Sequence, residues 1–308
     1  MKKMTLTKTQ TAIALALLAS SFAAYAGPDV PTKASNTESI VNTRHNLTQS
    51  YLGGTAVMMD SYRNNYEEVC VYCHTPHGAN TTISAPLWNR TNKATTYNTY
   101  NSSTLTQKVS QPGPNSLSCL SCHDGTVAID SIINMPGSGG YNANQMTSVN
   151  AGFLNTWSNP SSLNANHMTL GAEGSVYGCT MCHSNTSLTG PLNPYATNFD
   201  AFVIGTDLRN DHPVGIKYPS IGPGVDFNKY TSEFKNIAYF DDNGDGGLSK
   251  NEIRMYNTGD GYEVECASCH DPHGVPSSSP NAKIGEFTKS FLRIDNNESK
   301  VCQTCHVK

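Results

Sequence analysis

The chain has 308 residues, with 20 lysines and arginines against 24 aspartates and glutamates. The formal net charge of −4 excludes the strongly basic surface with which proteins bind nucleic acid. Asn, Ser, Thr, Gly and Pro are frequent, and stretches such as NRTNKATTYNTYNSSTLTQ lack a sustained period of 2 or 3.6 residues. This composition predicts loops and turns over much of the chain.

Residues 1–26 have the three parts of a secretory signal peptide. Lys2 and Lys3 form the positive start, TAIALALLASSF the apolar segment, and AYA at 24–26 the small-residue cleavage site. A membrane anchor is the alternative, but the apolar segment is shorter than the roughly 20 residues that span a bilayer. The sequence therefore predicts export of a mature chain, residues 27–308, with a formal charge of −7 once the three signal-peptide lysines are removed. An extracellular or cell-surface location is expected, with the periplasm as the alternative.

All ten cysteines occur in five C-x-x-C-H motifs. In chain order the motifs are Cys70, Cys73 and His74; Cys119, Cys122 and His123; Cys179, Cys182 and His183; Cys266, Cys269 and His270; Cys302, Cys305 and His306. At this spacing two thiols can bond the two vinyl groups of one haem while the following imidazole binds its iron. Zinc ribbons or a disulfide framework would leave the histidine that ends every motif without a role. The motifs therefore predict five covalently attached haems c.

Five haems in so polar a chain also predict the fold class. The chain cannot bury enough of its own apolar surface to fold alone, so the macrocycles would form its core. We expect one pentahaem cytochrome c domain over residues 27–308, mostly irregular and coil-rich, with short α-helices, little β structure and the polypeptide wrapped around five haems. The haem-free chain is then expected to be disordered.

Five histidines lie outside the motifs, at His45, His77, His167, His212 and His273. Five irons with two axial positions each need ten imidazoles, and the chain has ten histidines. The simplest assignment makes every haem bis-histidine. A surface or hydrogen-bonded role is the alternative for each of the five, and Met168 or Met181 is the rival ligand for any vacant position.

His77 and His273 each follow a motif histidine by three residues, in the repeated pattern H-x-P-H-G. The intervening proline stiffens the backbone, so neither side chain can easily reach round to the haem of its own motif. Each is expected to bind a neighbouring haem, His77 the one at Cys119 and His273 the one at Cys302.

The stretch DDNGDGGLSKNE, residues 241–252, fits the calcium loop pattern D-x-N-x-D-G-x5-E. The predicted oxygen ligands come from Asp241, Asn243, Asp245, the carbonyl of Gly247, Ser249 and Glu252. Gly246 provides the turn at position 6, and the apolar residues on either side of the loop could form short helices, as in an EF-hand. An acidic surface turn is the alternative. A single loop predicts one structural Ca²⁺ and argues against a paired calcium sensor.

The stretches CVYCHTPHG, CLSCHDGTVA, NDHPVG, CASCHDPHG and VCQTCH resemble the multihaem c-type cytochromes of metal-respiring bacteria. Within these, RHNLTQ and the small number of residues per haem are similar to the outer-membrane cytochromes S and E, which polymerise into extracellular nanowires. The resemblance implies a continuous stack of haems and a ligand histidine that one subunit donates to the next. His45, on an N-terminal arm, is the candidate for that ligand in a homopolymer.

These features predict an electron-transfer protein and not an enzyme, with no catalytic residues. We expect long-range electron transfer through five closely spaced bis-histidine haems, in a subunit of an extracellular filament that passes electrons to redox partner proteins or external acceptors. A monomeric periplasmic shuttle is the first alternative. A pentahaem reductase is the second, but it needs one iron open to substrate. No nucleic-acid partner and no transmembrane segment are expected.

Overall fold

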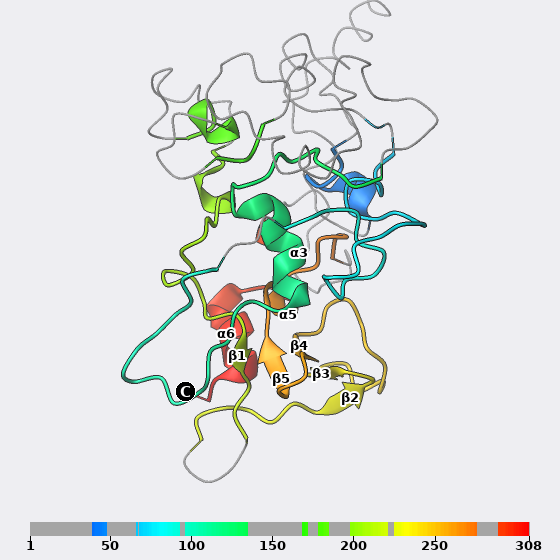
Figure 1. The fold of residues 1–308 in the computed structure, drawn as a ribbon. Coiled ribbons are helices and arrows are strands. Elements are labelled where there is room, and N and C mark those ends of the chain that lie inside the picture. The colour runs from blue at the N-terminus through cyan, green and yellow to red at the C-terminus, as the bar shows by residue number, and fades with distance from the viewer. Residues whose placement is uncertain are drawn as a thin grey trace, which may run out of the picture.

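The computed structural model describes residues 39–47, 66, 68–92, 96–134, 168–171, 178–184, 198–220, 225–275 and 289–307 (Figure 1). All five C-x-x-C-H motifs and the predicted calcium loop lie within these ranges. The predicted signal peptide and His167 lie outside them.

An antiparallel sheet of five strands organises the C-terminal part of the chain. Its strands are β1 (Ile216–Lys217), β2 (Ser232–Phe234), β3 (Ile237–Tyr239), β4 (Arg254–Asn257) and β5 (Tyr262–Val264), in the spatial order β1-β5-β4-β3-β2. The register places Ala238 opposite Met255 and Ile216 opposite Val264. Consecutive strands from β2 to β5 are neighbours, and only β1 joins the sheet from a distant part of the sequence.

The sheet has a hydrophobic core of its own. Tyr218, Ala238, Phe240, Ile253 and Met255 are buried together, and Ala238 and Met255 form a fully buried cross-strand pair. Partly buried apolar residues from other segments, including two from the last C-x-x-C-H helix, pack against this cluster. The sheet therefore fixes the position of the fifth motif.

Our expectation of a coil-rich fold with little β structure, wrapped around five haems, is wrong. Residues 216–220 and 225–264 instead contain the sheet and its side-chain core. The strands are two to four residues long, which is too short for alternation of apolar and polar residues to be read from the sequence. The pairing of β1 with β5 is also non-local, so no local pattern could reveal it.

The helices are short, and four of the eight in the described part of the chain carry C-x-x-C-H motifs. They are η2 (Ile40–Asn42), α3 (Pro114–His123), η3 (Cys179–Met181), η4 (Asp200–Phe202), α5 (Cys266–Cys269), η5 (Lys289–Phe291), η6 (Asn297–Ser299) and α6 (Lys300–Cys305). The longest, α3, begins with a proline at its first position, where the missing N–H is not needed. In Figure 1, α3 runs through the middle of the described part, with α5 and α6 at the end nearer the sheet.

Arg90 joins the segment after the first motif to the second motif. Its side chain is fully buried. The guanidinium donates to the hydroxyl and carbonyl of Ser121 in α3, and to the carbonyls of Ala128, Ile129 and Ser131, at 2.8–3.2 Å. One side chain thus satisfies five acceptors and holds the two motif regions together.

Candidate functional site

The five C-x-x-C-H motifs share one local structure. In four of them the backbone N–H of the motif histidine donates to the carbonyl of the first cysteine at 2.8–3.2 Å, in the pairs His74–Cys70, His183–Cys179, His270–Cys266 and His306–Cys302. The remaining motif, Cys119–His123, forms the last turn of α3. Residues four apart on a helical turn lie on the same face. Each motif therefore turns its first cysteine and its histidine to the same side.

Three motifs also meet a crossing segment in the same way. The carbonyl of the second cysteine accepts a hydrogen bond from a backbone N–H of the crossing segment. The backbone N–H of the residue after the motif histidine donates to the carbonyl of another residue of that segment, two positions before the first. The bonds are Asn89 N to Cys73 O and Thr75 N to Leu87 O; Arg293 N to Cys269 O and Asp271 N to Phe291 O; Asn228 N to Cys305 O and Val307 N to Asp226 O. Leu87 and Phe291 even share a positive φ, of 52° and 58°. The first and fourth motifs are thus structural repeats that extend beyond the H-x-P-H-G pattern.

Backbone carbonyls hold the Nδ1 atoms of three motif histidines. His74 Nδ1 lies 2.7 Å from the carbonyl of Pro86, His123 Nδ1 lies 2.6 Å from that of Phe202, and His270 Nδ1 contacts that of Ser290. A carbonyl can only accept, so Nδ1 carries the proton and Nε2 keeps its lone pair. This is the arrangement by which proteins orient an imidazole for binding a metal.

Two motif histidines face a histidine from elsewhere in the chain. The rings of His74 and His273 have centroids 6.1 Å apart and planes 12° apart. The rings of His45 and His123 have centroids 6.1 Å apart and planes 71° apart. A metal ion bound at about 2 Å from a nitrogen of each ring sets the two ring centres about 6 Å apart. Both pairs therefore have the spacing of two axial ligands on one metal.

The partner histidines are oriented in the same way as the motif histidines. His45 Nδ1 lies 3.2 Å from the carbonyl of Pro272, and His273 Nδ1 lies 3.1 Å from Oδ1 of Asp271. All four rings of the two pairs thus have an oxygen at Nδ1, which leaves Nε2 for a metal. Pro272 and His273 are adjacent, so the two pairs are also connected to each other.

Burial favours the neutral form of His45, His74, His123 and His270. It lowers the pKa of His45 to about 4, with a further lowering from His123, and it lowers the pKa of His74, His123 and His270 as well. A histidine must be neutral at the coordinating nitrogen to bind a metal. The burial of these rings therefore favours the ligand form at neutral pH.

The pairing differs from the one expected from the sequence. His273 lies beside His74 of the first motif and not beside the fifth motif, and His123 has His45 as its neighbour instead of His77. His45 contacts a histidine of its own chain, which removes the reason to assign it to a neighbouring subunit. His77 and His212 are exposed. His183 and His306 lie against phenylalanine rings, at centroid distances of 4.3 Å from Phe199 and 4.5 Å from Phe227.

None of the cysteines forms a disulfide; Cys179 is buried, Cys70 and Cys302 are exposed, and the other seven are half-buried. Burial raises the pKa of the thiols of Cys73, Cys179 and Cys305 to about 12, and that of Cys269 to about 11. Such thiols are not reactive thiolates at neutral pH. The thiols of Cys119 and Cys266, from the second and fourth motifs, lie within hydrogen-bonding reach of each other. No zinc ribbon is built from them, because no three cysteine and histidine ligand atoms converge within the described ranges.

Glu265 links the second motif to the fourth. It is the N-cap of α5, it is buried, and its carboxylate accepts from the backbone N–H of Gly113 at the start of α3 at 3.1 Å. Ser116 Oγ of α3 in turn accepts from the backbone N–H of Cys266 at 2.9 Å. Burial raises the pKa of Glu265 to about 7. No sequence signal marked Glu265 or Arg90, because their importance depends on contacts with distant segments.

The predicted calcium loop connects β3 to β4. The flanking segments are therefore strands and not the short helices expected from the EF-hand pattern. Asp241, Asp245 and Glu252 each place a carboxylate oxygen within 4.8 Å of the others. Gly246 has a φ of +72°, as the turn at position 6 requires. The side chains of Asn243 and Asp245 are hydrogen-bonded to each other at 2.9 Å. Gly247 and Ser249 lie in the same loop.

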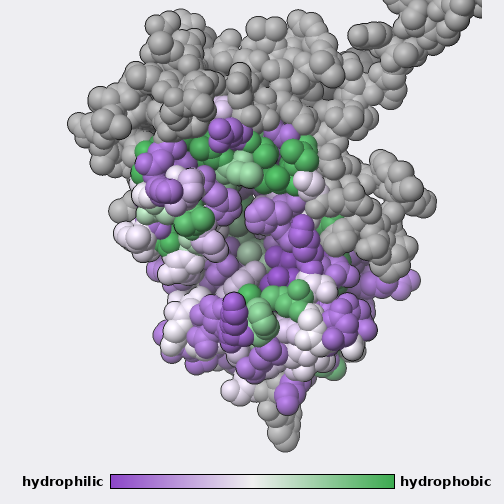
Figure 2. All heavy atoms as spheres, turned by 90° about the vertical axis from the view of Figure 1, so that its right-hand side faces the viewer, coloured by the Kyte–Doolittle hydropathy of each residue, from purple (hydrophilic) through white to green (hydrophobic). Residues whose placement is uncertain are grey.

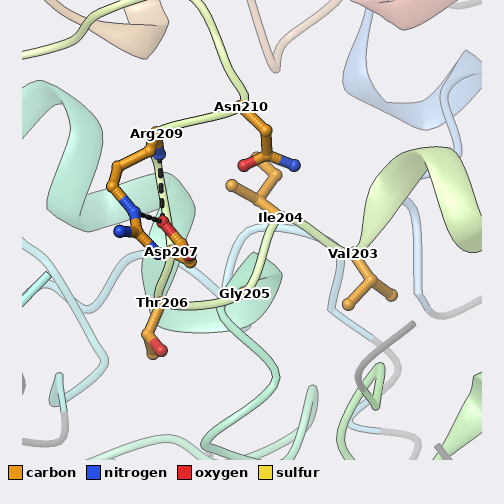
Figure 3. Close-up of a pocket in the computed structure, with 7 residues that line it drawn as sticks. All are labelled: Val203, Ile204, Gly205, Thr206, Asp207, Arg209 and Asn210. Atoms are coloured by element: carbon orange, nitrogen blue, oxygen red, sulfur yellow. Dashed lines mark hydrogen bonds and ion pairs between the residues drawn. The ribbon is translucent and has the colours of Figure 1, made fainter. Parts of the chain in front are cut away.

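An open cavity of about 560 Å³ lies next to the second motif. Its lining is one continuous segment, Val203, Ile204, Gly205, Thr206, Asp207, Arg209 and Asn210 (Figure 3). The N–H groups of Ile204 and Gly205 donate to the carbonyl of His123, at 2.9 and 3.1 Å. The side chain of Arg209 folds back on Asp207 with a contact of 2.6 Å, as Figure 3 shows. The cavity is therefore a surface recess beside a motif histidine.

The face of the molecule in Figure 2 is hollowed near its centre, with hydrophobic residues on two sides of the hollow and hydrophilic residues between them.

Within the part of the chain that the structure describes, no helix combines the length and the apolar character needed to cross a membrane. Comparison of the sequence with protein-family models and with curated proteins, and of the structure with solved structures, gives no match.

Proposed function

We propose that this protein transfers electrons through haems c attached at its five C-x-x-C-H motifs. The observation that carries the proposal is the pair of facing histidines at two of the motifs, with all four Nδ1 atoms bonded to oxygen. Histidines with only a surface or hydrogen-bonding role would not be expected to form two pairs with the same separation of ring centres. Imidazole nitrogen also suits iron, whereas the cluster of three carboxylates that could hold a hard cation lies in the β3–β4 loop.

Each motif would hold its haem through two cysteines and one histidine. At the first site Cys70 and Cys73 would form the thioether bonds, with His74 and His273 as the axial ligands. At the second site Cys119 and Cys122 would do so, with His123 and His45 as the axial ligands. Haem iron supplies one-electron redox chemistry when bound. The protein's own residues would supply attachment and orientation.

Two histidines on one iron leave no open position for a substrate. The first two sites therefore fit electron transfer and not the reduction of a small molecule. The hydrogen bonds to Pro86, Phe202, Pro272 and Asp271 fix the ring orientations and increase the basicity of the coordinating nitrogens. Both effects stabilise the oxidised iron and favour low reduction potentials.

Several contacts keep the sites close to one another. The carbonyl that holds His45 belongs to Pro272, which adjoins His273, so the ligands of the first and second sites are coupled. Glu265 and Ser116 join the second and fourth motif helices. Closely spaced haems allow electrons to move from site to site, and onward to a redox partner protein or an extracellular acceptor.

The same chemistry would serve a filament subunit or a monomeric shuttle. Since His45 is placed within its own chain, a filament with a shared ligand would need another histidine. His77 and His212 are exposed and belong to neither facing pair, whereas His273, which is also exposed, is already paired with His74.

The test is the ligation of holoprotein produced in a host that attaches haem c. Wild-type protein should carry five haems by mass and show low-spin ferric spectra. His273→Ala should convert one haem to a form that binds carbon monoxide when reduced, and His45→Ala should do the same for a second haem. His77→Ala is the matched control for His273→Ala, and neither of the two haems should bind carbon monoxide in this variant. Five haems with unchanged ligation in both variants would overturn the assignment of the two pairs, and a protein without haem would overturn the proposed function.

A further inference from the structure

The loop between β3 and β4 carries acidic side chains that the haem motifs do not use. Oxygen atoms of Asp241, Asp245 and Glu252 lie within 4.8 Å of one another. Two oxygens bound to opposite sides of one Ca²⁺, at 2.3–2.6 Å each, lie about 5 Å apart. The three carboxylates are therefore spaced as ligands around a single ion.

Glu252 distinguishes this loop from an ordinary acidic turn. The residue is 1 % exposed, and its Oε1 atom is buried without a hydrogen-bond partner. Its other oxygen accepts from the backbone N–H of Ser249 at 2.7 Å. An unpaired carboxylate oxygen is costly to bury. In a turn with no ligand this side chain would be expected in water, so its position points to a cation.

The nearest arginine does not supply that positive charge by direct contact. Arg254 follows Glu252 by two residues, but its guanidinium donates to the backbone carbonyls of Glu252 and Ser249. The carboxylates of Asp241 and Asp245 accept instead from backbone N–H groups of the loop, among them Gly246 and Gly247. The loop is thus held in shape with its carboxylates grouped.

A short chain of hydrogen bonds runs from the loop to the first haem site. Arg293, which is buried, donates from Nη1 to the carbonyl of Lys250 at 2.7 Å and contacts Asp271 Oδ2 at 3.3 Å. Asp271 Oδ1 accepts from the backbone N–H of His273 at 3.0 Å and lies 3.1 Å from His273 Nδ1. One arginine and one aspartate therefore separate the loop from a candidate axial ligand.

The geometry points to a Ca²⁺ site in the β3–β4 loop, with Asp241, Asp245 and Glu252 as its charged ligands, that sets the orientation of His273 through Arg293 and Asp271. Asn243, the Gly247 carbonyl and Ser249 complete the ligand set by their positions in the loop pattern. The Ca²⁺ site stands on its own residues. Only the coupling to His273 rests on the proposed haem function.

The ligand chemistry selects the ion. All the candidate donors are oxygens, and three are carboxylates, which suits a hard cation and not zinc or iron. The donor number is that of Ca²⁺, whereas Mg²⁺ in proteins is usually held by one or two carboxylates and several waters. The ion would offset the repulsion among the three carboxylates and hold the Lys250 carbonyl, which Arg293 contacts, in place.

The site is tested by calorimetric titration of the holoprotein with CaCl₂ after treatment with a chelator. Wild-type protein should bind one Ca²⁺ per chain and melt at a higher temperature with it. Asp241→Asn and Asp245→Asn should each weaken binding more than about tenfold, since even outer-shell changes cost that much. Asp242→Asn removes an exposed carboxylate between the ligands and is the matched control, with unchanged affinity. Absence of binding to the wild type, or equal losses in all three variants, would overturn the site.

The coupling is tested by the reduction potential and the ferric electron paramagnetic resonance (EPR) signal of the haem that His273→Ala alters. In the wild type both should change on addition of Ca²⁺, and in Asp241→Asn and Arg293→Met they should not. Arg293→Met should still bind Ca²⁺, since Arg293 is not a ligand. If Ca²⁺ binds to the wild type and the haem signals do not move, the coupling is wrong while the Ca²⁺ site stands. If the purified protein carries no haem but still binds Ca²⁺, the proposed haem function is wrong while the Ca²⁺ site stands.

Discussion

His74 and His273 belong to the first and fourth motif regions, yet their rings lie 6.1 Å apart and only 12° from parallel. The other facing pair, His45 and His123, has the same separation with planes 71° apart. The two pairs therefore share a ring spacing and differ in the angle between their ring planes.

This difference predicts two kinds of low-spin ferric signal in EPR spectra. Parallel imidazole planes remove the near-degeneracy of two iron d orbitals and give a rhombic spectrum, while nearly perpendicular planes leave them close and give a highly anisotropic one. His273→Ala should remove a rhombic component, and His45→Ala should remove an anisotropic one. The opposite assignment would show that the ring orientations change when haem is attached.

Substitution of the buried Arg90 is expected to cause a large loss of stability. Arg90→Met removes the buried donor of the Ser121 hydroxyl and of the carbonyls of Ser121 and Ile129, whereas the carbonyl of Ala128 still accepts from the N–H of Ser131. We expect the free energy of unfolding to fall by at least about 3 kcal/mol, since each unsatisfied buried acceptor costs about 1–3 kcal/mol. The measurement is chemical denaturation of the holoprotein followed by circular dichroism.

Arg209→Met is the control for Arg90, because its ion pair with Asp207 is exposed, at side-chain exposures of 62 % and 49 %. Such a pair is worth about 0–1 kcal/mol. Similar losses in both variants would contradict a special role for the buried arginine.

The raised pKa of Glu265 predicts that the free energy of unfolding falls as the pH rises. Its pKa is raised from 4.5 to about 7 by burial, so the folded protein binds more protons than the unfolded chain between these values. Stability is therefore greatest below the unfolded pKa and is lost as the pH passes through the folded pKa. Relative to Glu265→Gln, the wild type should lose up to about 3 kcal/mol between pH 4.5 and pH 8.

The check on Glu265 is denaturation of both proteins at pH 5 and pH 8. Glu233→Gln, which changes an exposed carboxylate that accepts from Tyr262, serves as a control. Parallel pH profiles for the wild type and Glu265→Gln would contradict the raised pKa.

The sheet predicts residual structure in the haem-free protein, in place of the disorder expected from the sequence. Tyr218, Ala238, Phe240, Ile253 and Met255 are buried against one another as a cluster of side chains. Protein produced without haem attachment should protect the amides of β3 and β4 from hydrogen exchange, and Met255→Ala should abolish this protection by opening a cavity. Complete exchange throughout the haem-free chain would show that the sheet depends on haem.

The sequence by itself determined the local geometry of the C-x-x-C-H motifs and of the acidic loop. The C-x-x-C-H spacing and the calcium loop pattern are short, so their geometry follows from a few neighbouring residues. The motifs indeed form single helical turns, and three acidic residues of the loop converge. The same local reading missed the sheet, because its strands are only two to four residues long.

Only the tertiary structure decided which histidines face each other and which buried charges join the motifs. His273 could face any motif histidine near the fourth motif, and the choice of His74 depends on crossing segments far away in the chain. Arg90, Glu265 and Arg293 likewise look ordinary in sequence, since a charged side chain acquires a structural role only from the partners that surround it. Long-range contacts of this kind follow from packing of the whole chain, which no local pattern encodes.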